Sequence, residues 1–253
     1  MKTPTLVTLA MSLGLSPIAQ AESCTVRSGP VKNALVELYT SEGCSSCPPA
    51  DRWLSALQVP ASQPQVVPIA FHISYWDDLG WKDAYADPRF TERQRALARA
   101  ARRASVYTPQ VIIDGHDFPA WYGASTPATL KAVSKRPAKA TLEITQSVST
   151  SGVTARVGVQ LAARPSSKLT LVVVMTENHL GSRVTAGENR GETLRHDFVA
   201  RDLVAIPLPA AGDYPVRFSA KPGWKPADTR VVAFVQDDAS GEVLQALVGC
   251  AAS

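Results

Sequence analysis

The chain has 253 residues, of which 45% are hydrophobic, and a formal net charge of +4 at pH 7. A chain of this length and composition can bury a substantial core, so its four cysteines are not needed as a substitute for one. The small positive charge predicts neither a nucleic-acid partner nor a membrane partner. The sequence leaves the oligomeric state open.

Residues 1–21 have the pattern of a secretory signal peptide. Met1-Lys2 supplies a short basic start, an apolar stretch runs from Thr5 to Ala19, and Ala19-Gln20-Ala21 is a small-x-small cleavage site. The apolar stretch falls short of the roughly 20 residues that a spanning helix needs, although an uncleaved anchor is the alternative. We therefore expect a soluble chain from residue 22 onward, periplasmic or secreted, in a compartment where disulfides persist.

Cys44 and Cys47, separated by two serines, lie between a strand pattern and a helix pattern. The apolar run Ala34–Tyr39 predicts a strand directly before them. Two thiols at this spacing can close into a small ring that is easily opened again, and a helix N-terminus can stabilise a thiolate. The pair therefore indicates dithiol/disulfide exchange.

A second strand, a helix and a third strand are predicted next. Val66–Phe71 is an apolar run of strand length, Phe90–Ala104 has a helical composition, and Val111–Ile113 predicts a short strand before Asp114-Gly115. His72 follows the second strand and is a candidate for proton transfer or, together with the two thiols, for binding Cu(I). The alternative, which we favour, is a hydrogen-bonded structural histidine.

The segment between the second strand and the helix is rich in aromatic side chains. Tyr75, Trp76 and Trp81 are interleaved with Asp77, Asp78 and Asp83. We expect this segment to pack over the domain, and the alternative is a binding groove beside the thiols in which Trp76 contacts the substrate. The helix carries five arginines that we expect on a solvated face: Arg93, Arg95, Arg99, Arg102 and Arg103.

After the polar break at Lys135–Lys139, nearly every segment has a strand pattern. The predicted strands are Thr141–Ile144, Thr154–Leu161, Leu169–Thr176, Val199–Leu208, Tyr214–Phe218 and Arg230–Val235. Their spacing predicts an all-β, immunoglobulin-like sandwich over residues 137–253, without an inter-sheet cysteine pair. It would follow an α/β domain over residues 22–136.

Three polar features fall in this second half. Gly187–Gly191 is predicted to be a loop in which Glu188 and Arg190 can pair. His179 and His196 lie nearby, but two histidines in one β domain carry little metal signal.

Cys24 and Cys250 lie near the two ends of the expected mature chain. Four cysteines allow three pairings, and the termini of a domain often lie close together. We therefore expect a structural disulfide between Cys24 and Cys250, which leaves Cys44 and Cys47 for chemistry.

Several stretches resemble a family of secreted bacterial proteins catalogued as domain of unknown function 1223. They are Val36–Asp51, Phe71–Asp77, Gly80–Asp83, Arg93–Arg95, Val106–Gln110 and Gly187–Gly191. That family is assigned to the thioredoxin-like superfamily, so the resemblance implies an α/β thioredoxin-like first domain. In that fold the corresponding X-Pro bond is cis and lies beside the cysteine pair, which implies that Thr108 and Pro109 bind the substrate.

Pro48-Pro49 bears on which sulfur attacks. Proline is best tolerated in the first turn of a helix, so the helix is predicted to begin at Pro48 with Cys47 near its cap. The helix dipole would then favour a Cys47 thiolate at least as much as a Cys44 thiolate. By analogy with thioredoxins, we nevertheless expect Cys44 to attack and Cys47 to resolve.

The leading hypothesis is an exported thiol-disulfide oxidoreductase that acts on protein thiols or disulfides and needs no cofactor. One alternative is a Cu(I)-binding or delivery protein that uses Cys44, Cys47 and His72. The other is a non-enzymatic protein-binding module in which Cys44 and Cys47 form a structural disulfide.

Overall fold

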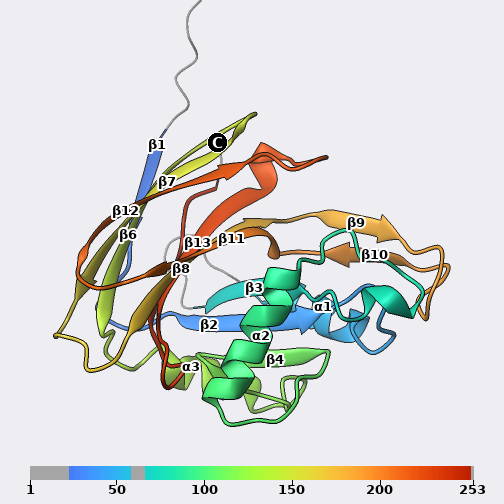
Figure 1. Ribbon diagram of the computed structural model, residues 1–253, viewed down its shortest axis with the longest axis horizontal. Coiled ribbons are helices and arrows are strands. Elements are labelled where there is room, and N and C mark those ends of the chain that lie inside the picture. The colour runs from blue at the N-terminus through green and yellow to red at the C-terminus, as the bar shows by residue number, and fades with distance from the viewer. Residues whose placement is uncertain (1–22, 58–65, 252–253) are drawn as a thin grey trace, which may run out of the picture.

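The computed structural model of the protein describes residues 23–57 and 66–251 (Figure 1). Of these residues, 43% lie in strands and 16% in helices. The signal peptide expected over residues 1–21 lies outside the described residues. Within the described ranges, every helix is too short or too polar to cross a membrane.

The strands form a sheet of four, a sheet of eight and a separate hairpin. The antiparallel sheet of four has the order β1 (Ser23–Arg27), β6 (Ala140–Ser149), β7 (Gly152–Leu161) and β12 (Gly212–Ser219). The sheet of eight has the order β14 (Val243–Val248), β13 (Thr229–Asp237), β8 (Leu169–Glu177), β11 (Val199–Pro207), β3 (Val66–His72), β2 (Ala34–Thr40), β4 (Gln110–Ile113) and β5 (His116–Asp117). The hairpin pairs β9 (Leu180–Arg183) with β10 (Thr193–His196).

The sheet of eight contains strands from both halves of the chain, which overturns the predicted fold class. At the junction, β11 lies parallel to β3 with Val199 opposite Ala70, and the Ala70 N–H donates to the Phe198 carbonyl at 2.8 Å. The sheet therefore continues past β3 into the C-terminal strands. The expected α/β thioredoxin-like domain is wrong, because the protein is mostly β and its few helices pack on one mixed sheet that contains strands from both halves of the chain.

The four-stranded sheet packs face to face with the β14–β13–β8–β11 end of the larger sheet. Leu142 of β6 and Val157 of β7 are fully buried and belong to one apolar cluster with Val173 of β8 and Ala233 of β13. Alternate residues of β6 are buried, as expected for a strand with one face on a core. The β-rich, sandwich-like character predicted for this half is therefore present.

The helices lie on the two faces of the larger sheet, and α2 also packs over its C-terminal strands. Helices α1 (Pro48–Ser55) and α3 (Thr126–Val133) contribute Leu54 and Leu130 to a cluster with Val36 of β2. Helix α2 (Pro88–Ala100), which crosses in front of the sheet in Figure 1, contributes Phe90 to a cluster with Leu35 of β2. Two short 3₁₀ helices, η1 (Asp77–Leu79) and η2 (Pro226–Asp228), complete the described elements. Strand β2 is thus buried on both faces and leads directly into the cysteine turn.

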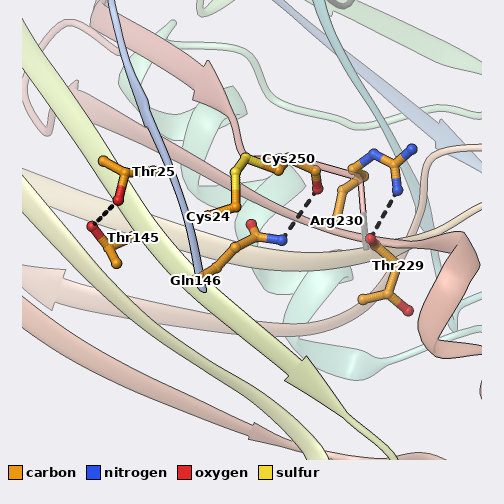
Figure 2. Close-up of a disulfide and its surroundings, with 7 residues drawn as sticks. All are labelled: Cys24, Thr25, Thr145, Gln146, Thr229, Arg230 and Cys250. Atoms are coloured by element: carbon orange, nitrogen blue, oxygen red, sulfur yellow. Dashed lines mark hydrogen bonds between the residues drawn. A yellow bond between two sulfur atoms is a disulfide. The ribbon is translucent and has the colours of Figure 1, made fainter. Parts of the chain in front are cut away.

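The disulfide between Cys24 and Cys250 links the two sheets (Figure 2). Cys24 lies in the edge strand β1, Cys250 follows the edge strand β14, and their Cα atoms are 6.3 Å apart. Gln146 of β6 donates from Nε2 to the Cys250 carbonyl at 3.1 Å. This is the pairing that the sequence favours, and it supplies the inter-sheet cysteine link that we did not expect.

Replacing Cys24 and Cys250 together by serine is expected to lower the free energy of unfolding by about 2–5 kcal/mol. The two cysteines are 226 residues apart, so their bond restricts most of the unfolded chain. Denaturant unfolding of both proteins without reductant measures the difference. The variant Cys44→Ser/Cys47→Ser is the control, and equal midpoints for wild type and the Cys24/Cys250 variant would contradict the expectation.

Candidate functional site

Cys44 and Cys47 lie in the turn between β2 and α1. Helix α1 begins at Pro48 and Cys47 is its N-cap residue, which confirms the prediction made from Pro48-Pro49. Both cysteines are free thiols and fully buried, whereas Ser45 and Ser46 between them are exposed. The pair therefore lies one side chain beneath the protein surface.

The two sulfurs have opposite environments. The hydrogen bond from the Cys47 thiol lowers the pKa of Cys44 to about 7, although burial of Cys44 acts in the opposite direction. Ser46, whose Oγ lies 3.2 Å from Cys44 Sγ, also lowers this pKa. Burial raises the pKa of Cys47 far above its usual value, and the neighbouring Cys44 raises it further. Burial thus outweighs the helix dipole at Cys47, and Cys44 is the more readily ionised thiol.

Thr108 contacts both sulfurs. Its carbonyl oxygen lies 3.9 Å from Cys44 Sγ, its Oγ1 lies 3.4 Å from Cys47 Sγ, and the Thr108–Pro109 bond is cis. Thr108 Oγ1 donates its single proton to the Tyr39 carbonyl at 2.9 Å. Burial raises the pKa of Cys47 more than the contact with Thr108 lowers it, so Cys47 remains the less readily ionised thiol.

Gln94 of α2 holds the chain on either side of Thr108-Pro109. Its buried Nε2 donates to the Tyr107 carbonyl at 2.8 Å and to Gln110 Oε1 at 2.7 Å. The neighbouring Arg93 is not on a solvated face, contrary to expectation, because its Nε donates to the buried Glu37 at 2.7 Å. No local pattern in the sequence indicates a role for Gln94, although its stretch Arg93–Arg95 belongs to the resemblance.

Five buried ionisable side chains gather beside the turn: Glu42, Asp51, His72, Asp83 and His196. His72 Nδ1 lies 2.7 Å from Asp83 Oδ2, and His196 lies 3.2 Å from a Glu42 oxygen and 3.8 Å from an Asp51 oxygen. The two imidazole rings are 4.9 Å apart between centroids. His196, from β10 in the second half of the chain, thus belongs to the site, which sequence spacing could not reveal.

The charges in this cluster fix the protonation of His72. Burial alone would lower the pKa of His72, but Asp83, Asp51 and Glu42 raise it to about 9. Burial would likewise raise the pKa of Asp83, but His72 lowers it below its usual value. At neutral pH the two therefore form a buried ion pair. The contacts described for His72 are with this cluster and with the Tyr85 ring, so its role in proton transfer stays a prediction.

The aromatic segment packs against the cysteine turn. The carbonyl oxygens of Trp76 and Trp81 both lie 3.7 Å from the position that a Cβ on Gly43 would take. Trp81 also donates from Nε1 to Glu42 Oε2 at 2.9 Å, and Trp76 is half-buried against the core between the sheet and α2. The segment therefore packs over the fold beside the thiols, and contact of Trp76 with a substrate stays a prediction.

The loop Gly187–Gly191 binds the outer side of the cysteine turn. Asn189 donates from Nδ2 to the carbonyls of Glu42 and Cys44, at 2.8 and 2.9 Å. The Glu188 carboxylate accepts from the Ser45 N–H at 2.9 Å and from its hydroxyl at 2.7 Å. Glu188 therefore binds Ser45, whereas the sequence had suggested a pair with Arg190. The only sequence signal for this contact was that both stretches belong to the resemblance.

The described part of the chain contains no group of three or more His, Cys, Asp or Glu side chains placed to hold a metal ion. His179 is exposed and lies 2.8 Å from Asp228, whereas His196 is buried in the cluster beside the turn. The two histidines of the second half therefore lie in different surroundings, His179 at the surface and His196 in the buried cluster.

Comparisons with known proteins show the fold and the family. A search of curated proteins found no match. The crystal structure of a protein from Agrobacterium tumefaciens is similar at 24% identity with a TM-score of 0.62, covering 88% of this chain and 96% of that one. HBP35 of Porphyromonas gingivalis is similar at 17% identity with a TM-score of 0.60, covering 87% and 76%. Likeness at these identities concerns the fold alone.

The family described as Protein of unknown function (DUF1223) matches residues 35–236. This range includes the cysteine turn, Thr108 and the loop that contains Asn189. The chain belongs to this family.

Proposed function

We propose that the protein is a thiol-disulfide oxidoreductase in which Cys44 and Cys47 are the reacting pair. The observation that carries the proposal is the opposite environment of the two thiols, with the pKa of Cys44 lowered to about 7 and that of Cys47 raised. A thiol that attacks a disulfide works best when its pKa lies near the ambient pH, and a resolving thiol must wait in the protonated form. A purely structural pair needs no such difference.

The proposed reaction has two steps, each an attack of a thiolate on a disulfide sulfur. The Cys44 thiolate attacks one sulfur of a partner disulfide, a Cys44–partner disulfide forms, and the other partner sulfur leaves as a thiolate that takes up a proton. Cys47 then loses its proton to solvent and attacks Cys44 Sγ, so that the Cys44–Cys47 disulfide forms and the remaining partner thiolate is released and protonated. The pair is oxidised by two electrons and the partner disulfide is reduced, and the reverse sequence oxidises a partner dithiol.

The partner approaches across the exposed serines of the turn. Cys44 is fully buried, so the Ser46 side chain, 3.2 Å from its sulfur, has to move aside for attack. Thr108, whose carbonyl faces Cys44, then lies beside the mixed disulfide, with Pro109 next to it and Trp76 as a further contact. We propose a periplasmic or secreted location, because the Cys24–Cys250 disulfide persists where the surroundings are oxidising.

The variant Cys47→Ser is expected to accumulate mixed disulfides between Cys44 and its partners, because the second step is blocked while the first is intact. Non-reducing electrophoresis after rapid acid quenching and alkylation measures them. Cys44→Ser, which keeps the second cysteine but removes the attacking thiol, is the matched control and should trap nothing. Insulin reduction should be lost in both variants.

Two other outcomes would each replace the proposal. A Cys44–Cys47 potential far below about −300 mV, with no trapped partner, would make the pair a structural disulfide in a binding module. Binding of one Cu(I) by the reduced protein, lost in Cys44→Ser and accompanied by no trapped disulfide, would make it a copper-binding protein.

A further inference from the structure

The bonds inside the cysteine turn are long. The Cys44 N–H donates to the Ser41 carbonyl and the Cys47 N–H to the Cys44 carbonyl, each at 3.2 Å. This is the upper end of the normal range for such bonds, so neither holds the turn firmly. The geometry around the Cys44 sulfur must therefore depend on contacts from outside the turn.

Asn189, from the second half of the chain, binds the backbone of this turn from outside. Its amide nitrogen bridges the Glu42 and Cys44 carbonyls at 2.8 and 2.9 Å, on either side of Gly43. Both partners are acceptors only, so the NH₂ group of the amide must face them. Asn189 is itself only 7% exposed, so water does not easily replace it.

Glu188 holds the next residue of the same turn. Its Oε2 accepts both the N–H and the hydroxyl proton of Ser45. The loop that carries both side chains is itself seated closely, because a Cβ on Gly187 would meet Trp81 Cβ at 3.1 Å and Gly187 has a φ of +72°. Two side chains on one closely packed loop thus bind three residues of the turn: Glu42, Cys44 and Ser45.

We propose, resting on the function proposed above, that Asn189 and Glu188 are positioning residues that hold the turn so that hydrogen-bond donors face the Cys44 sulfur. Those donors are the Cys47 thiol, the Ser46 hydroxyl and the N–H groups of Ser46 and Cys47. The second half of the chain thereby completes a site whose cysteines lie in the first half. Without these contacts the turn opens and the thiolate loses its donors.

The test is the pH titration of the Cys44 thiolate, followed by its ultraviolet absorbance in the reduced protein, with Cys44→Ser as the blank. The wild-type midpoint is expected near 7. Asn189→Ala and Glu188→Ala should each raise the midpoint by about half a pH unit or more, a factor of about three in the ionisation constant. Glu188→Gln keeps an acceptor oxygen and should stay near wild type. Arg190→Ala in the same loop and Glu192→Gln directly after it alter exposed side chains with no described contact to the turn, so both should leave the midpoint unchanged.

A circular-dichroism melt of each variant separates positioning from folding. Unchanged midpoints in folded Asn189→Ala and Glu188→Ala would overturn the proposal, and if Asn189→Ala does not fold, Glu188→Ala alone decides. The titration needs no partner disulfide, so it stands apart from the trapping experiment. Shifted midpoints without trapped partners would overturn the proposed oxidoreductase function but support the positioning role. Trapped partners with unchanged midpoints would support the oxidoreductase function but overturn the positioning role.

Discussion

Replacing Asp83 by alanine is expected to lower the free energy of unfolding by about 3–5 kcal/mol at neutral pH, as measured by denaturant unfolding. The change leaves the His72 cation buried without its partner, which lies 2.7 Å away in the wild type. It also removes the acceptor of the Glu42 and Tyr85 N–H groups, which donate to Asp83 at 2.9 and 2.8 Å. Unsatisfied buried donors and an unpaired buried charge both favour unfolding.

The pH dependence of stability identifies the charge of this pair. The pKa of His72 is raised from 6.5 to about 9, so its contribution is fully present below about pH 6.5 and is lost as pH rises through about 9. A shift of this size corresponds to roughly 3 kcal/mol. Asp83→Asn keeps an oxygen for the backbone donors but removes the charge, so its stability should fall less over this pH range. Parallel pH profiles for wild type and Asp83→Asn would contradict the buried ion pair.

Local sequence patterns predicted most strands but not how they join. The apolar runs at Val66–Phe71 and Leu169–Thr176 correspond to β3 and β8, and the helix pattern at Phe90–Ala104 corresponds to α2, which spans Pro88–Ala100. The predicted fold class failed at the junction of β3 and β11, where a single parallel pair, Val199 with Ala70, makes the two halves share a sheet. Nothing in either strand's own pattern specifies its neighbour, because the pattern of apolar residues indicates a strand and its buried faces but not the strand that it pairs with.

The residues of the candidate site were also only partly predictable from local sequence patterns. Cys44 and Cys47 were evident from their spacing, and Thr108 from the resemblance, because each carries its signal within a few residues. His196 contacts Glu42, and Asn189 contacts both Glu42 and Cys44. Each of these partners is more than 140 residues away along the chain. A lone histidine or asparagine in a β-rich segment has no local pattern that predicts such a contact, so only the fold could place them.

The buried pair of Glu37 with Arg93 connects the core to the Thr108 segment. Arg93 lies 4.8 Å from the Phe234 ring centroid and donates to Gln236 as well as to Glu37, whose side chain is completely buried. The next residue on α2 is Gln94, which holds Tyr107 and Gln110. A substitution at Arg93 should therefore affect both the stability of the fold and the position of Thr108.

Replacing Arg93 by methionine is expected to cost about 3–5 kcal/mol in the free energy of unfolding, because methionine fills similar space but leaves the Glu37 carboxylate buried and unpaired. Denaturant unfolding measures this cost. Arg95→Met is the matched control, since Arg95 lies on the same helix in an exposed pair with Glu92, which is worth less than about 1 kcal/mol.

A double-mutant cycle tests the cause of this loss. Glu37→Gln removes the charge left by Arg93→Met, so the double variant should be more stable than the sum of the two single losses predicts. Additive losses, or an Arg93→Met variant as stable as Arg95→Met, would mean that the pair contributes little. Because Gln94 follows Arg93, the Arg93→Met variant should also shift the Cys44 titration, whereas Arg95→Met should leave it unchanged.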